Sequence, residues 1–140
     1  MHTLLPPGGS RNGLDCALWD LQAKQTAGGI SALTGITLTP LHTLFTLSLD
    51  DPDAMARRAH EAPDLKRLKL KLNAQAPLDC LQAVRDARPD AQLVIDANGS
   101  WTPELVMASG DTLARFKVAL LEQPLPLGED GALEKMRYPV

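Results

Sequence analysis

From about residue 41 onward, two spacings of hydrophobic positions take turns along the chain: every second residue, as in strands, and every third or fourth residue, as in helices. Short apolar runs with strand-like alternation begin near residues 44, 67, 92 and 118, at a step of 23 to 26 residues. Between them, apolar residues recur every three or four positions, as in amphipathic helices. The pattern predicts strands at 44–49, 66–72, 92–96 and 118–122, and helices at 54–61, 77–87 and 103–116. Strands and helices that alternate at this step are typical of βαβ units. We therefore expect an α/β fold, a partial (β/α) barrel of about four βα units.

The first 40 residues follow a different pattern. A turn at residues 6–9 precedes a predicted helix, capped by Ser10 or Asn12 and ended by the glycine pair at 28–29. Residues 30–40 are predicted to be irregular. At the other end of the chain, residues 133–137 predict a short helix. We divide the chain into two parts, residues 1–40 and residues 41–140. The apolar face of the first helix is Leu14, Ala17, Leu18 and Leu21, with Trp19 alongside.

Charged residues stand at the ends of three predicted strands. Lys69 and Lys71 lie two positions apart, so on a strand they share one face while the neighbouring leucines share the other. Asp96 and Glu122 each end a later strand. Lys71 and Asp96 are 25 positions apart, and Asp96 and Glu122 are 26 apart. Successive strands of a βα-barrel would bring these side chains to the rim where such barrels carry out their chemistry.

Each of these signals also has a plainer interpretation. Lys69 and Lys71 fit a half-exposed strand with solvated charges, because lysines are mostly exposed. Asp96, which precedes Ala-Asn-Gly at residues 97–99, fits a turn cap. Glu122 fits a turn less well, since Glu is a poor turn former. The regular spacing favours one common site over three unrelated features.

Two carboxylates and a lysine are the groups that a metal-assisted proton transfer needs. A carboxylate pair suits Mg²⁺, a hard cation that keeps waters and takes substrate oxygens. A lysine whose pKa is lowered by a second lysine and by partial burial can remove a proton α to a carboxylate, while the cation stabilises the enediolate. No further strand-end acid follows; Glu129, Asp130 and Glu134 fit loop and helix-surface positions.

Composition narrows the class of protein. The 140 residues are 44% hydrophobic and 22% charged, with a formal net charge of -3 and a pI near 5.5. This charge does not favour nucleic acid or a membrane surface as a partner. No apolar run approaches the roughly 18 residues of a membrane span, and residues 6–9 interrupt any signal-peptide pattern, so we expect a cytoplasmic location. Cys16 and Cys80 are expected to be buried free thiols.

Four segments stand in order along the chain and together carry a resemblance. They are residues 11–21 (Arg-Asn-Gly-Leu-Asp-Cys-Ala-Leu-Trp-Asp-Leu), Lys69-Leu70-Lys71, residues 96–101 (Asp-Ala-Asn-Gly-Ser-Trp) and residues 121–125 (Leu-Glu-Gln-Pro-Leu). The chain resembles the enolase superfamily, in its muconate-lactonizing and dipeptide-epimerase branch, of the L-Ala-D/L-Glu epimerase type. The resemblance covers most of residues 3–140. It implies that residues 41–140 are the first half of a (β/α)7β barrel, and residues 1–40 the end of an α+β capping domain.

The resemblance also implies a role for each candidate residue. Lys71 looks like the base on one face of the substrate α-carbon, and Lys69 like its neighbour, which contacts the substrate carboxylate and tunes Lys71. Asp96 and Glu122 look like Mg²⁺ ligands. Asn98 is expected to contact the substrate or to support the ligands, and Thr46 is expected near the substrate. Trp101 is expected to anchor the following helix rather than to contact substrate.

Members of this family have a third metal ligand on a fifth strand and a second lysine on a sixth, so we expect these 140 residues to be a fragment that is inactive alone. For the intact parent we expect epimerisation of a dipeptide. An N-acyl amino acid racemase or a related enediolate enzyme is the alternative within the same fold. Alternatives of another class are a non-catalytic remnant, a half-barrel that pairs with a complementary chain or with itself through its open strand edges, and an unrelated α/β domain.

Overall fold

The computed structural model describes residues 5–135. The chain divides into two compact units, Met1–His42 and Thr43–Val140, and residues 35–44, between the last helix of the first unit and the first strand of the second, form neither helix nor strand. The predicted division at residues 40 and 41 falls in this stretch. The assignment of the first part to a capping domain stays a prediction. None of the helices in residues 5–135 combines the length and apolar character that a membrane span requires.

The first unit contains helices α1 (Gly9–Gln25) and α2 (Gly29–Thr34). The predicted helix is confirmed, but the predicted caps are wrong. The Asn12 N–H already donates to Gly8 O at 3.1 Å, so Ser10 and Asn12 lie inside the helix. Helix α2 lies where irregular chain was predicted. Gly28 and Gly35 flank it in left-handed conformation, and its six residues are too few to show a helical period.

No residue of α1 is buried within the part of the chain that the structure describes. Cys16 is exposed, so the prediction of a buried thiol is wrong there, whereas Cys80 is buried as expected. The apolar face of α1 is uncovered: Leu14, Leu18, Trp19 and Leu21 are each 44–53% exposed.

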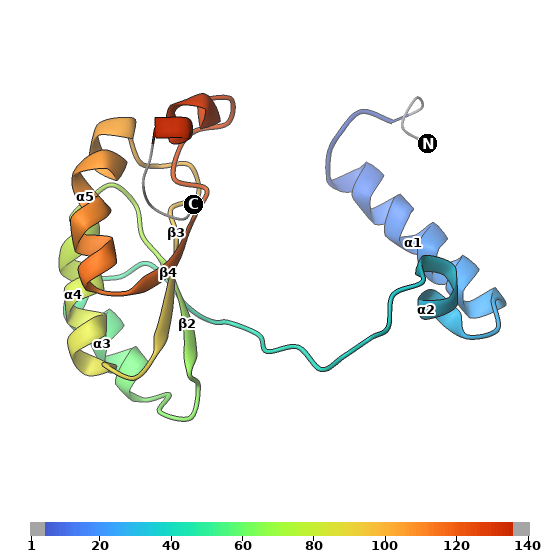
Figure 1. Cartoon of the computed structure of the whole chain (residues 1–140), viewed down its shortest axis with the longest axis horizontal. Coiled ribbons are helices and arrows are strands. Elements are labelled where there is room, and N and C mark those ends of the chain that lie inside the picture. The colour runs from blue at the N-terminus through green and yellow to red at the C-terminus, as the bar shows by residue number, and fades with distance from the viewer. Residues whose placement is uncertain (1–4, 136–140) are drawn as a thin grey trace. The chain divides into compact units, whose positions relative to one another are not determined.

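The second unit is a four-stranded parallel sheet with strand order β1-β2-β3-β4. The α/β fold predicted from the alternating pattern is confirmed. Helices α3, α4 and α5 lie on one side of this sheet (Figure 1). The elements are β1 (Phe45–Leu47), α3 (Pro52–His60), β2 (Arg67–Lys71), α4 (Pro77–Ala87), β3 (Gln92–Asp96), α5 (Pro103–Arg115), β4 (Val118–Glu122) and a 3-10 helix, η1 (Asp130–Lys135). The end of the helix predicted at 133–137 lies outside the described residues.

Local sequence explains where the helices of this unit begin. Asp51 caps α3, because its Oδ1 accepts a hydrogen bond from the Ala54 N–H at 2.8 Å. The Thr102 hydroxyl accepts from the Leu105 N–H at 3.3 Å and caps α5. A proline opens each of α3, α4 and α5, where its missing N–H removes no helical bond. Each helix therefore begins close to the residue where the sequence predicts it.

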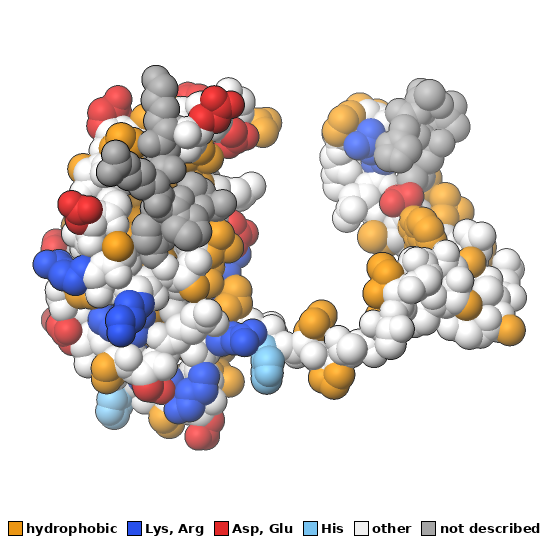
Figure 2. Space-filling model, in the orientation of Figure 1, with side chains coloured by type: hydrophobic (Ala, Val, Ile, Leu, Met, Phe, Trp, Pro, Cys, Tyr) orange, Lys and Arg blue, Asp and Glu red, His pale blue; other side chains and the backbone are white. Residues whose placement is uncertain are grey.

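The core lies between the sheet and these helices. Leu68 and Leu70 of β2 and Ile95 of β3 are fully buried on this side, and Trp101 is 1% exposed. The Trp101 indole Nε1 donates to Leu72 O at 3.2 Å and to Asn73 O at 3.1 Å, which confirms the tryptophan as a packing anchor. Hydrophobic side chains are also visible on the surface of this unit, on the side where the strands lie (Figure 2).

A buried arginine holds the chain before β2. The Arg88 side chain is 5% exposed and pairs with Asp90. Its guanidinium donates to backbone carbonyls of the segment from α3 to β2, including Ala62 O at 2.6 Å and Leu65 O at 2.9 Å. This contact supports the end of the sheet opposite to the candidate residues. Such positions in βα-barrels contribute stability rather than chemistry.

Candidate functional site

The parallel register places the candidate residues in two neighbouring layers on one face of the sheet. Lys71 pairs with Asp96, and Asp96 pairs with Glu122, so these three residues lie side by side at the carboxyl ends of β2, β3 and β4. Lys69 pairs with Thr46 of β1 and lies two residues before Lys71, in the neighbouring layer of the same face. Residues two apart on a strand share a face, so both lysines lie on the side of the sheet opposite to the leucine core.

Lys69 connects the two carboxylates. Its Nζ lies 2.9 Å from Asp96 Oδ2 and 2.7 Å from Glu122 Oε2. The side chains of Lys69 and Asp96 are 19% and 2% exposed, and that of Glu122 is 37% exposed. The solvated-strand interpretation therefore does not hold for Lys69, because its side chain is only 19% exposed and its ammonium group is paired with two carboxylates.

Lys71 has a different set of partners. Its Nζ donates to Asn98 Oδ1 at 2.7 Å and to Asp96 Oδ2 at 3.3 Å, while its side chain stays 41% exposed. The family resemblance implies a supporting or substrate-contacting role for Asn98, but it does not show that the amide oxygen of Asn98 binds Lys71. An amide two residues after a strand-end carboxylate is the only sequence signal for this contact.

The neighbouring carboxylates shift the pKa of Lys69 in the direction opposite to the one expected from the sequence. Hydrogen bonds with Glu122 and then with Asp96 raise the pKa of Lys69. The prediction that a neighbouring lysine and burial lower the pKa is therefore wrong for Lys69, since opposite charges lie within hydrogen-bond distance. Burial pushes the pKa of Asp96 upward, but bonds from Lys69, the Asn98 N–H and Lys71 outweigh it, and the pKa is lower than usual.

The loop after β3 fixes the direction of Asp96. Its Oδ1 accepts from the Asn98 N–H at 3.0 Å, so Asp96 does cap a turn, as the plainer interpretation predicts, while its Oδ2 faces the lysines. Asn98 and Gly99 are in left-handed conformation, with φ of 47° and 71°. The Gly99 N–H donates to Gln123 O at 2.7 Å. This bond ties the loop that carries Asn98 to the loop that follows Glu122.

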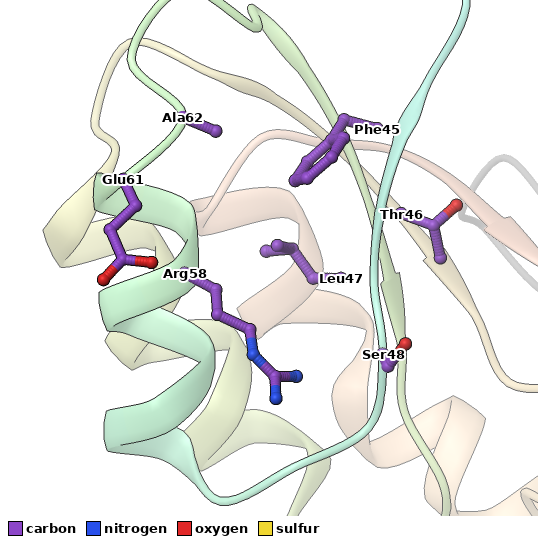
Figure 3. A pocket seen from close by; sticks show the side chains of 7 residues that line it. All are labelled: Phe45, Thr46, Leu47, Ser48, Arg58, Glu61 and Ala62. Carbon is purple, nitrogen blue, oxygen red and sulfur yellow. The ribbon is translucent and has the colours of Figure 1, made fainter.

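Thr46 lies on the edge strand β1, beside a cavity of about 290 Å³ between β1 and α3. Figure 3 shows Phe45 and Leu47 pointing toward the helix and Thr46 pointing to the other side of the strand. Thr46 therefore shares the face that carries Lys69, as its register requires. The Thr46 side chain is exposed on this face.

The donor set of the site suits a divalent cation. Asp96 Oδ2 and Glu122 Oε2 converge on one positive charge, the Lys69 ammonium group. Mg²⁺ is usually held by one or two carboxylates and keeps several waters. Among residues 5–135, no group of three or more His, Cys, Asp or Glu is placed to hold a metal ion. Within these residues, Asp96 and Glu122 are therefore the two strand-end acids that could contribute to a cation site.

Parallel βα units with acids and lysines at the carboxyl ends of the strands are the arrangement expected of a βα-barrel enzyme domain. Residues 53–139 match the family described as "Enolase C-terminal domain-like", and the chain belongs to this family. The resemblance stated from the four sequence segments is thus confirmed.

Two curated relatives are similar to the chain over nearly its whole length. An L-Ala-D/L-Glu epimerase of Escherichia coli (strain K12) is 42% identical over 100% of this chain and 44% of its own. An N-acetyl-D-glutamate racemase of Pseudoalteromonas sp is 38% identical over 97% of this chain and 43% of its own. The chain therefore spans less than half the length of these relatives. Both are isomerases, as predicted for the family.

Solved structures show the same likeness. An enolase family member from Agrobacterium tumefaciens with homology to dipeptide epimerases, solved with sodium and L-Ala-L-Glu, has a TM-score of 0.86 at 38% identity, over 99% of this chain and 43% of that chain. A dipeptide epimerase from Cytophaga hutchinsonii, complexed with Mg and D-Ala-L-Val, has a TM-score of 0.75 at 26% identity, over 85% of this chain and 34% of that one. Magnesium and dipeptides thus occur in related structures.

Proposed function

We propose that the protein containing this chain is a Mg²⁺-dependent epimerase that inverts the α-carbon of the C-terminal residue of a dipeptide of the L-Ala-D/L-Glu type. The observation that carries the proposal is the contact of Lys69 with both Asp96 and Glu122 at the ends of adjacent strands. This contact supports one site in which amines and carboxylates converge. The 42% identity to an L-Ala-D/L-Glu epimerase favours this substrate class.

Asp96 and Glu122 would hold the cation, and Mg²⁺ when bound would supply positive charge to the substrate carboxylate as its negative charge increases. Lys71 accepts the α-proton at Nζ in its unprotonated form. Asn98 Oδ1, at 2.7 Å, holds that nitrogen in place. Lys69 binds the substrate carboxylate, and Thr46 lines the same face beside it. The setting we propose is recycling of cell-wall peptides in the cytoplasm.

Racemisation of an N-acylated amino acid is the second candidate function. The 38% identity to an N-acetyl-D-glutamate racemase over almost the whole chain favours it. Both reactions begin with removal of a proton α to a carboxylate, so Lys71, Asp96 and Glu122 have the same roles in each. The two candidates differ only in the group attached to the substrate nitrogen.

Exchange of the substrate α-proton tests the proposal. The coding locus is sequenced beyond codon 140, and the product of the complete reading frame is incubated with L-Ala-L-Glu or N-acetyl-glutamate in D₂O with Mg²⁺. We expect the NMR signal of the glutamate α-proton of the dipeptide to disappear, and to persist after EDTA treatment. Faster exchange of N-acetyl-glutamate would select the second candidate. Absence of exchange in both compounds would contradict the proposal and favour the alternative interpretations, a non-catalytic remnant or a half-barrel that needs a complementary chain.

A further inference from the structure

Lys69 occupies the position between the two carboxylates of the site. One ammonium group bonds Asp96 Oδ2 at 2.9 Å and Glu122 Oε2 at 2.7 Å. Two carboxylates on adjacent strand ends repel each other unless a positive charge lies between them. Since Asp96 is 2% exposed, water alone would compensate its charge poorly. Lys69 therefore neutralises the pair from within the chain.

Lys71 does not serve the pair in this way. Its shorter bond, at 2.7 Å, goes to the neutral amide oxygen of Asn98, and its distance to Asp96 Oδ2 is 3.3 Å. Among the ion pairs found within residues 5–135, Glu122 pairs with Lys69 and not with Lys71. The two lysines of the Lys-x-Lys pair therefore have separate electrostatic roles.

Asp96 Oδ2 and Glu122 Oε2, the oxygens that face each other between the strand ends, are both bonded to the Lys69 ammonium group, and a cation placed between these strand ends would use the same two oxygens. Mg²⁺ binds oxygen at about 2.0–2.1 Å and demands regular octahedral geometry. An ammonium group in hydrogen-bond contact with both oxygens fills the space between them and repels the incoming charge. Cation and ammonium group cannot occupy this position together.

We propose that Lys69 is an internal counter-ion of the carboxylate pair, which a divalent cation must displace, so that metal loading releases Lys69. The inference rests on the proposed metal site. In the metal-free state Lys69 keeps the two strand ends together. In the loaded state its ammonium group is free for an anionic substrate group, so the cation binds before the substrate carboxylate can engage Lys69.

Binding of Mn²⁺ to the product of the complete reading frame, followed by electron paramagnetic resonance, tests the inference. Replacement of Lys69 by Met removes the competing charge, and we expect the dissociation constant to fall about tenfold. Lys66→Met is the matched control, because Lys66 pairs with Asp90 at 3.0 Å, away from the carboxylate pair. Its dissociation constant should equal that of the wild type. Asp96→Asn should abolish binding and so locate the cation.

The outcomes separate this inference from the proposed function. Binding that depends on Asp96 but is unchanged in Lys69→Met would overturn the displacement of Lys69 and leave the metal site standing. Absence of Mn²⁺ binding in both the wild type and Lys69→Met would overturn the metal site itself, and the inference with it.

A second measurement uses the wild type alone and does not depend on the folding of a variant. Carbon-13 NMR of the lysine Cε signals is recorded during Mg²⁺ titration. We expect the Lys69 signal to shift with the midpoint of metal binding while the Lys66 signal stays in place. Saturable Mg²⁺ binding without a change at Lys69 would contradict the displacement.

Discussion

Asp96 is the residue of the candidate site that contacts both lysines and the loop after β3. Its Oδ2 receives both lysines, and its Oδ1 accepts the Asn98 N–H. Hydrogen bonds to charged groups contribute more than those between neutral groups, and a buried partner left unpaired costs more still. The two oxygens of the carboxylate therefore have different partners.

Replacement of Asp96 by Ala should lower the free energy of unfolding by about 2–3 kcal/mol, because Lys69 and the Asn98 N–H lose a buried partner. Urea denaturation followed by circular dichroism measures the change. Asp86→Ala is the control: Asp86 accepts a bond from Gln82 on the exposed surface of α4, and we expect a change within about 0.5 kcal/mol. Equal effects of the two substitutions would show that the Asp96 contacts are not formed.

The lowered pKa of Asp90 predicts how the free energy of unfolding depends on pH. Hydrogen bonds from Arg88 and then from Lys66 hold the pKa of Asp90 well below its ordinary value of 3.8. Because the folded pKa lies below the unfolded one, the contribution of Asp90 is complete above that ordinary value and is lost as pH falls below it. Wild type should therefore be more stable than Asp90→Asn near neutral pH, and the difference should shrink in acid. A difference that stays constant from about pH 6 to about pH 3 would contradict this ion pair.

At the scale of elements, the loop after β3 depends on Gly99. Its φ of 71° is left-handed, and a Cβ on it would lie 3.1 Å from Leu125 O. Gly99→Ala should therefore lower the free energy of unfolding by about 1–2 kcal/mol. Gly110→Ala on α5 is the matched control, because nothing lies within 4 Å of its added Cβ and Ala favours a helix. Thermal unfolding of the two variants should shift in opposite directions.

The sequence predicts elements well where hydrophobic period and capping agree. The bounds of α4, β3 and β4 agree with the prediction, because a proline opens the helix and a carboxylate ends each strand. It fails for α2, where two glycines enclose six residues. The strand ends predict that Lys69, Asp96 and Glu122 share one rim. They do not predict that Lys69 bridges the acids, since that depends on how far a long side chain reaches between two strands.

At the scale of the whole molecule, the chain consists of two compact units and belongs to a family whose curated relatives are more than twice as long. Residues 35–44 form no helix or strand, and Ile36, Leu38 and Leu41 in this stretch are 61–91% exposed. Exposed chain without regular structure is the preferred site of proteolysis.

Limited digestion with thermolysin, which cleaves before large apolar residues, should therefore cut first between residues 35 and 44. Mass spectrometry should then find a fragment that contains all of residues 45–135 and resists further cleavage. The buried core of the second unit explains this resistance. Early cleavage within α4 or β3 would contradict the division into two units.

The carboxyl ends of β2, β3 and β4 are the divalent-cation site that we propose. Paramagnetic broadening by substoichiometric Mn²⁺, read from assigned backbone amide signals of the product of the complete reading frame, tests this site directly. We expect that the amides of Ala97, Asn98 and Gln123, which adjoin Asp96 and Glu122, broaden first. Prior broadening around the exposed acids Asp50, Asp51 and Asp53, with the strand ends unaffected, would contradict it.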